Sequence, residues 1–174
     1  MNIIDTIKTH KPKTVYDLKE LAIRVKPIGS GAYRKAYRII DTDIVIKFPD
    51  SAYLEEWEGG EDNAYNECLD HARQEIKVIR RIETVGKYKG LRPLLPNVYY
   101  TNMRHGVIAM EYCKPLRYSS KNQAISSLIS QFAYAIATGK DNKGWDDYDI
   151  RRANIGINNN GAYKIIDLGL FDDR

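Results

Sequence analysis

The stretch IGSGAYRKAY, residues 28–37, carries two glycines, Gly29 and Gly31, between β-prone runs. VKPIGS leads into the stretch, and AYRII and DIVIKF follow, separated by a short turn at residues 41–43. Because glycine has no Cβ, a glycine-rich turn between strands can bring backbone N–H groups close to phosphates. A dinucleotide fingerprint needs a helix after the glycines and a P-loop needs GK[ST], so neither fits. We predict an antiparallel hairpin whose glycines either bind phosphate or simply turn the chain.

A lysine interrupts the apolar run DIVIKF. Side chains alternate along a strand, which puts Val45 and Lys47 on one face and Ile44, Ile46 and Phe48 on the other. A lysine in this place is either a solvent-side residue of a half-exposed strand or one half of an ion pair. The second interpretation requires an acidic partner.

Residues 63–82 supply that partner on a predicted helix. Their apolar residues recur at steps of three and four, which predicts one long amphipathic helix. Glu75 borders its apolar face, and a partly buried carboxylate there needs a cation. Glu67 is the alternative partner for Lys47, and a plain surface glutamate remains the third interpretation.

The remaining pattern completes an α+β chain. Thr14 is a plausible N-cap for a helix over residues 15–24, and the segment at 49–62 is rich in Pro, Gly and acidic residues. Further elements are predicted as a connector at 86–96, strands at 97–101 and 106–112 joined by NMRHG, a helix at 121–138, and strands at 155–157 and 162–166 joined by NNNG. Strands with one helix, followed by a mostly helical part, indicate the α+β class.

Three polar residues stand out near the end of the sequence. In DIRRANIG, Asp149 precedes Asn154 by five positions, and Asp167 in IIDLGL follows Asn154 by thirteen. Each could be an ordinary loop residue. Together they could also be parts of one phosphate-handling site, because carboxylate and amide oxygens are the ligands that Mg²⁺ prefers.

Taken in order, these pieces resemble the protein kinase-like fold. GSGAYRKAY looks like the glycine-rich loop, VIK like the strand lysine, RQEIKVIRRI like the helix with the paired glutamate, VIAMEYCKPL like the strand into the hinge, DIRRAN like the catalytic loop, and DLG like the metal-binding motif. The resemblance covers about residues 25–171. It implies a five-stranded antiparallel N-lobe sheet with one long helix (1–113) and a truncated, mainly helical C-lobe (114–174).

The resemblance also implies roles in ATP- and Mg²⁺-dependent phosphoryl transfer. Asp149 would accept or orient the acceptor hydroxyl, and Arg151 would steady the γ-phosphate. Nucleotide binding would use Gly29, Ser30 and Gly31 of the loop, Lys47 on the α- and β-phosphates, Glu75 as its partner, Met110 as gatekeeper, and Glu111 and Cys113 at the adenine. Asn154 and Asp167 would bind the metal.

Several departures from the family pattern matter. Arg34 replaces the third glycine, which predicts a stiffer and more basic loop tip, and Asp147-Tyr148 replaces the His-Arg pair before Asp149. An acidic stretch, EEWEGGED, lies between Lys47 and Glu75 and is either a solvated loop or a cover or partner site. We expect the C-lobe to be cut short, because only five residues follow Gly169.

Composition bears on the partners and the cellular location of the protein. The net charge of +4 is mild and no predicted helix face collects the basic residues, which does not favour a nucleic-acid partner. Cys68 and Cys113 lack the spacing of a disulfide framework or zinc site. No apolar stretch is long enough to cross a membrane, so a soluble, cytoplasmic protein without a membrane partner is expected. The compact chain, rich in Tyr, Asn and Lys, would suit a phage or mobile-element protein.

Two functions from different classes follow. The first is a minimal Ser/Thr protein kinase, which transfers phosphate to a protein acceptor or to itself. The second is a catalytically silent module that binds nucleotide or a regulatory protein partner. A small-molecule phosphotransferase is a weaker third, because such enzymes build the acceptor pocket from C-terminal helices. A homodimer or another protein is one way to complete the short lobe.

Overall fold

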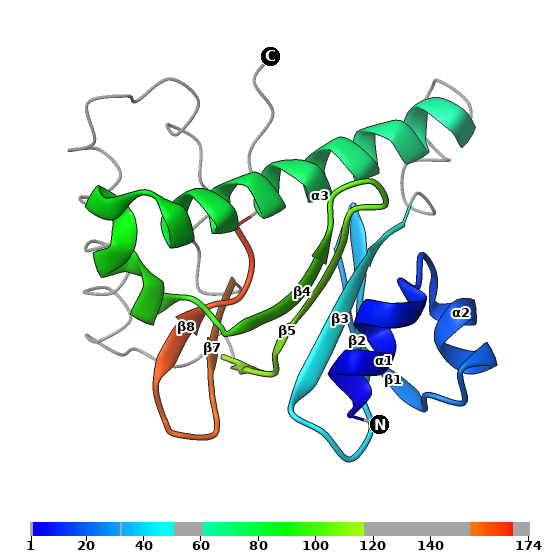
Figure 1. The fold of residues 1–174 in the computed structure, drawn as a ribbon, viewed down its shortest axis with the longest axis horizontal. Helices are drawn as coiled ribbons and strands as arrows, with labels where there is room; N and C mark the ends of the chain where they lie inside the picture. The colour runs from blue at the N-terminus through cyan, green and yellow to red at the C-terminus, as the bar shows by residue number, and fades with distance from the viewer. Residues whose placement is uncertain (1, 32, 51–60, 117–153, 169–174) are drawn as a thin grey trace. The chain divides into compact units, whose positions relative to one another are not determined.

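The computed structural model describes residues 2–31, 33–50, 61–116 and 154–168. The chain divides into two compact units, the first made of Met1–Ile76 with Asn97–Tyr112 and the second of Lys77–Pro96 with Cys113–Arg174. The predicted lobes, 1–113 and 114–174, stay a prediction. Figure 1 shows the described elements as α1 (Ile3–His10), α2 (Val15–Glu20), β1 (Val25–Ser30), β2 (Arg34–Ile39), β3 (Ile44–Pro49), α3 (Glu61–Thr84), η1 (Gly86–Leu94), β4 (Val98–Asn102), β5 (Val107–Glu111), β6 (Lys114–Pro115), β7 (Ile155–Ile157) and β8 (Tyr163–Ile165).

The first unit is built on a five-stranded sheet in the order β1-β2-β3-β5-β4, with every neighbouring pair antiparallel. Short turns join β1 to β2, β2 to β3 and β4 to β5, as the β-prone runs predicted. The chain leaves the sheet between β3 and β4 to form the long helix α3. This confirms the α+β class, with a five-stranded antiparallel sheet and one long helix.

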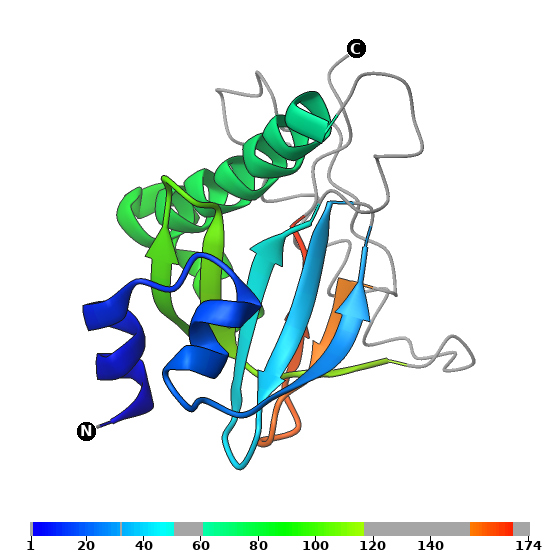
Figure 2. The ribbon, with the colours of Figure 1, turned by 90° about the vertical axis from the view of Figure 1, so that its right-hand side faces the viewer.

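One face of this sheet carries the apolar core of the unit. Ile44, Ile46 and Phe48 of β3 point to this face, as strand alternation predicted. They pack with residues of α1, α2, β2 and β5, the fully buried members being Ile7, Leu18, Ile39, Ile46, Val107 and Ala109. Figure 2 shows α1 and α2 lying beside the strands. The two N-terminal helices therefore cover this face.

The N-terminal helices differ from the prediction in two ways. Helix α1 was missed, although Ile3, Ile4 and Ile7 have helical spacing and the Asn2 side chain accepts a hydrogen bond from the Ile4 N–H. Helix α2 begins after Thr14, which forms the expected cap through a full capping box with Asp17. It ends at Glu20 and not at residue 24, because Ala22 adopts a left-handed backbone with φ 56°.

Helix α3 has nearly the predicted extent, since it runs over Glu61–Thr84 where the spacing predicted 63–82. Cys68, Ala72, Ile76, Ile79 and Ile82 are all buried, so the apolar stripe faces the protein interior. Stability of such a helix comes mainly from burying its apolar face, because intrinsic helix propensity is weak.

The second unit contains a small sheet in the order β6-β7-β8. Strands β7 and β8 form the predicted hairpin, and its turn is closed by Asn158, whose side-chain oxygen accepts hydrogen bonds from the N–H groups of Asn160 and Ala162. Gly161 in this turn has φ +78°, which glycine tolerates without a steric cost. Strand β6 was not predicted. The expected helix at 121–138 lies outside the described residues.

Candidate functional site

A row of residues crosses the sheet of the first unit on the face opposite the apolar core. The register pairs Gly29 with Ala36, Ala36 with Lys47, and Lys47 with Ile108. Residues directly opposite each other on neighbouring strands share a face. Gly29 and Lys47, 18 positions apart in the sequence, therefore share one face of the sheet, with Ala36 of β2 between them.

Lys47 forms an ion pair with Glu75 on this face. Its Nζ lies 3.2 Å from the Glu75 Oε1, and the two side chains are only 9% and 2% exposed. Of the two partners that the sequence left open, the structure selects Glu75, and Glu67 is exposed. The pair links the central strand β3 to α3. Breaking a buried pair is costly because it leaves one charge uncompensated, roughly 3–5 kcal/mol.

Arg34 is a second cation on the same carboxylate, which the sequence analysis did not predict. Its Nη1 pairs with the Glu75 Oε2, and its side chain is 10% exposed. Arg34 stands at the start of β2 and shares a sheet face with Ala36, so its side chain is directed to the side where Lys47 lies. The expectation of a basic side chain at the hairpin tip is corrected: Arg34 is nearly buried and faces α3.

The two glycines of the hairpin have few neighbouring atoms among the described residues. A Cβ added at Gly29 would meet no atom of the described residues within 4 Å, and at Gly31 only the Arg34 carbonyl oxygen at 3.9 Å. Neither glycine has a positive φ. Ser30 between them pairs with Lys35 in the ladder. Packing among the described residues therefore does not require glycine at either position.

The residues expected at the adenine fall on β5 and just after it. Met110 is buried and pairs with Val45, so it shares the sheet face of Lys47. The Glu111 N–H donates to the Asn97 carbonyl oxygen at 2.7 Å, and so this N–H already has a partner within the first unit. Cys113 is buried and belongs to the second unit.

The proposed metal ligands Asn154 and Asp167 both belong to the second unit, where they flank the β7–β8 hairpin. Ile155 pairs with Ile165, and the Asn154 carbonyl oxygen accepts a hydrogen bond from the Ile166 N–H at 2.7 Å. The antiparallel pairing of β7 with β8 thus brings the backbone at Asn154 close to that at Asp167, although the two residues are thirteen positions apart in the sequence. The two side chains offer an amide and a carboxylate oxygen, a donor set that fits Mg²⁺.

Other predicted site residues lie outside the described residues. These are Asp149 and Arg151, together with most of the acidic stretch between Lys47 and Glu75. Within the ranges that the structure describes, no group of three or more His, Cys, Asp or Glu side chains is placed to hold a metal ion.

Cys68 and Cys113 are both buried, and neither forms a disulfide. The Cys68 thiol donates a hydrogen bond to the Asp50 carbonyl oxygen at 3.1 Å, and burial raises its pKa to about 11. A thiol with this pKa is almost fully protonated at neutral pH, which favours a packing role for Cys68.

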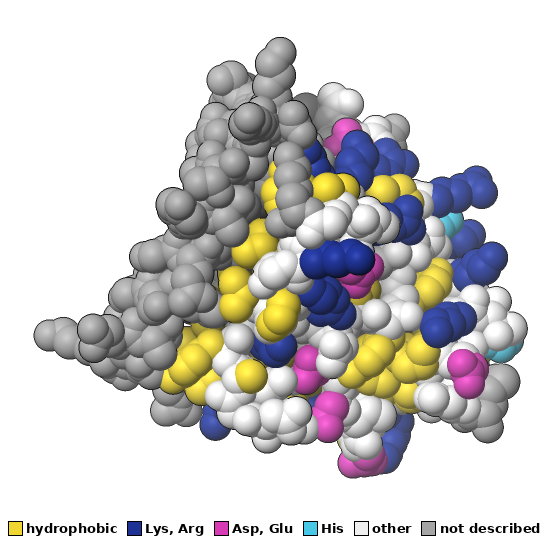
Figure 3. Space-filling model, turned by 60° about the vertical axis from the view of Figure 1, so that its left-hand side comes forward, with side chains coloured by type: hydrophobic (Ala, Val, Ile, Leu, Met, Phe, Trp, Pro, Cys, Tyr) yellow, Lys and Arg dark blue, Asp and Glu magenta, His cyan; other side chains and the backbone are white. Residues whose placement is uncertain are grey.

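Surface charge on the described part of the chain is mixed. Figure 3 shows Lys and Arg side chains interspersed with Asp, Glu and hydrophobic ones on the visible face. None of the helices that the structure describes is long and apolar enough to cross a membrane.

Comparison with known proteins gives no family for this chain. No model of a protein family matches the sequence, and no curated protein matches it either.

The contact of Arg34 with Glu75 is the part of this site that the sequence did not predict. Strand alternation from Ala36 indicates that Arg34 lies on the Lys47 face. The family pattern has a glycine at this position, which predicts a loop residue and not a strand residue.

Proposed function

We propose that this protein is a protein kinase-like phosphotransferase that binds Mg-ATP and transfers its γ-phosphoryl group to a Ser or Thr hydroxyl of a protein. The observation that carries the proposal is the buried ion pair between Lys47 and Glu75, at 3.2 Å. It stands in one row with the open glycine hairpin, on the face away from the apolar core.

The architecture of the first unit supports the kinase-like interpretation. The resemblance implied an antiparallel five-stranded sheet, a glycine-rich turn, a strand lysine, and one long helix whose glutamate meets that lysine. The sheet and the helix are present, and the lysine and glutamate meet. A buried lysine on a strand is uncommon without such a partner, because an unpaired ammonium is costly to remove from water.

The glycines support phosphate binding in particular. Gly29 lies on the face of Lys47, and its backbone is open to approach in the part of the chain that the structure describes. A residue without Cβ at an unobstructed strand end lets backbone N–H groups come close to a ligand. A phosphate chain could then contact the hairpin backbone and the Lys47 ammonium together.

The chain's own groups would act by positioning and charge, which is what phosphoryl transfer needs most. Lys47, held by Glu75, would bind the α- and β-phosphates. Asp149 would accept the proton of the attacking hydroxyl, and Arg151 would steady the γ-phosphate. Asn154 and Asp167 would hold Mg²⁺, which neutralises charge on the phosphates when bound.

A catalytically silent nucleotide-binding module is the second candidate. What favours it is that Lys47, Glu75 and Gly29, whose geometry the structure describes, are residues to which the proposal assigns nucleotide binding. Transfer additionally requires Asp149, which is proposed from its spacing in the sequence. Turnover separates the two functions.

The test is transfer of γ-labelled phosphate from Mg-ATP, with the protein alone and with a cell lysate as a source of acceptors. Three variants accompany the wild type: Asp149→Ala, Asp167→Ala and the control Asp41→Asn. Asp41 is a suitable control because its carboxylate is 76% exposed and pairs with an exposed arginine. Asparagine removes the charge and tolerates the left-handed backbone of Asp41, which has φ 61°. Nucleotide binding is measured on the same proteins by calorimetry.

We expect label on a protein in the wild type and in Asp41→Asn. Asp149→Ala should bind Mg-ATP normally and lose transfer by at least about 100-fold, the usual contribution of a general base. Asp167→Ala should lose Mg-dependent binding. Binding without transfer in the wild type would establish the silent module. A wild type that does not bind Mg-ATP would overturn both functions.

A further inference from the structure

Two neighbouring residues of the glycine-rich hairpin hold it against α3. The Tyr33 ring stacks on the His71 ring, with centroids 3.7 Å apart and planes inclined by 14°. The next residue, Arg34, pairs with Glu75. His71 and Glu75 are four positions apart on α3 and so lie one above the other on the same helix face. The hairpin is therefore attached to two successive turns of the helix.

The hairpin also contacts Asp50, the residue that follows β3. The Asp50 N–H donates to the Tyr33 carbonyl oxygen at 3.1 Å, and the Lys35 ammonium lies 2.5 Å from the Asp50 carboxylate. Residues 33–35 thus all have contacts beyond the hairpin, whereas Gly29 has open space beside it in the described structure. One arm of the hairpin is fixed and the glycine arm is accessible.

Glu75 connects this attachment to the site. Its Oε2 meets Arg34 and its Oε1 meets Lys47, so one buried carboxylate is shared by the hairpin and the strand lysine. A movement of the hairpin away from α3 would remove one cation from Glu75. The remaining cation, Lys47, would then be free to change its geometry relative to the carboxylate.

We propose that Tyr33 and Arg34 form a latch that holds the glycine-rich hairpin on α3 before any ligand arrives, and that Arg34 is a positioning residue for Lys47. The effect on ligand binding rests on the proposed function, whereas the latch itself does not. Ordering a flexible hairpin during binding costs conformational entropy, so a hairpin that is already fixed binds a polyphosphate more tightly.

The latch is tested first without nucleotide, by amide hydrogen exchange on the full chain. The variants are Arg34→Ala, Arg34→Lys and Tyr33→Ala, and the control is Arg24→Ala, which removes the same charge from an exposed pair with Asp41. We expect amides of residues 29–36 to exchange about tenfold faster in Arg34→Ala, the equivalent of one charge-assisted hydrogen bond. Tyr33→Ala should loosen the same amides, and Arg24→Ala should not.

The second measurement is the affinity for Mg-ATP and the separation of KM from kcat in any transfer reaction. Arg34→Ala should weaken binding by about tenfold. Arg34→Lys should restore part of this loss, because an ammonium keeps the charge but not the planar fork. In a transfer reaction, Arg34→Ala should raise KM and leave kcat nearly unchanged, because Arg34 is not assigned a contact with the transferred group.

The outcomes separate the two proposals. Unchanged exchange in both Arg34→Ala and Tyr33→Ala would overturn the latch, whatever the nucleotide result. Equal or tighter Mg-ATP binding by a folded Arg34→Ala would overturn its role in preparing the site. If Arg34→Ala does not fold, Tyr33→Ala decides the question by the same criteria. A wild type that fails to bind Mg-ATP would overturn the proposed function, and hydrogen exchange would still decide the latch.

Discussion

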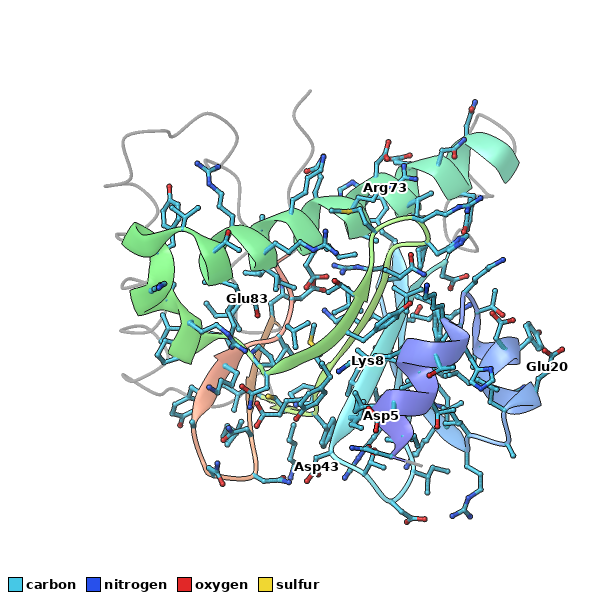
Figure 4. The ribbon with its side chains drawn as sticks, in the orientation of Figure 1. Asp5, Lys8, Glu20, Asp43, Arg73 and Glu83 are labelled. Atoms are coloured by element: carbon cyan, nitrogen blue, oxygen red, sulfur yellow. The ribbon has the colours of Figure 1, made fainter. Side chains whose placement is uncertain are left out.

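Two hairpins of the same sheet contact α3 through an arginine. In one hairpin the arginine belongs to the sheet, and in the other it belongs to the helix. In the glycine-rich hairpin, Arg34 at the start of β2 reaches the helix and pairs with Glu75. In the turn between β4 and β5, Arg73 of the helix reaches the turn, and Figure 4 shows it beside that turn. Its guanidinium donates to the carbonyl oxygens of Met103 and Arg104, at 3.2 and 3.4 Å.

The glycines of these two turns differ more sharply. Gly106, in the β4–β5 turn, has φ +62°, and a Cβ there would come within 2.7 Å of the Ala72 Cβ and 2.8 Å of the Pro49 Cγ. Gly29 has neither constraint in the described structure. Packing therefore requires glycine at Gly106, while at Gly29 packing among the described residues has no such requirement. Under the proposed function, glycine at position 29 serves the approach of a ligand to the backbone.

The largest expected effect comes from Gly106→Ala. The added methyl group meets atoms of Ala72 and Pro49, and alanine is strained at this positive φ. We expect a loss of about 2–4 kcal/mol in the free energy of unfolding, from overpacking together with backbone strain. Chemical denaturation measures it. A loss no larger than that of Gly29→Ala would remove the contrast between the two turns.

Gly29→Ala should have the opposite profile. With a negative φ and open space, alanine should leave stability unchanged or raise it by up to about 1 kcal/mol through the unfolded state. Affinity for Mg-ATP should nevertheless fall, because the methyl group obstructs the approach to the backbone. Denaturation and calorimetry on one preparation give both values. Unchanged affinity would show that Gly29 serves no ligand.

Arg73→Ala should have a moderate effect confined to the β4–β5 turn. The variant loses two hydrogen bonds to backbone carbonyls and an exposed contact with Asp70. We expect about 1–2 kcal/mol of destabilisation and no change in nucleotide affinity. Faster hydrogen exchange should appear at residues 102–106 and not at 29–36. Loosening of both turns would mean that α3 couples them.

The smallest expected effect is a pH dependence of the free energy of unfolding that comes from His105 in the β4–β5 turn. Burial lowers the pKa of His105 below its ordinary value of 6.5, and nearby Lys13, Arg104 and Arg73 lower it further. A group whose pKa is depressed in the folded state contributes stability that is full above the unfolded pKa and is lost as the pH falls through the folded pKa. Stability should therefore decrease slightly as the pH falls below 6.5. An NMR titration of His105 checks the direction.

Local patterns in the sequence determined much of the fold. Steps of three and four predicted α3 within two residues at each end, and alternation predicted the two faces of β3. The capping box at Thr14 was also visible, because capping depends on residues within three positions. The early end of α2 was not, since the left-handed backbone at Ala22 has no mark in the residue type.

The candidate site shows the same division. The sequence by itself provided the glycines, Lys47, two possible glutamate partners, and the spacing of Asn154 and Asp167. Only the tertiary structure decided that Glu75 and not Glu67 is the partner, and that Arg34 shares its carboxylate. The choice depends on how α3 is rotated about its axis against the sheet. That rotation is set by burying the whole apolar stripe, and no short stretch of sequence contains it.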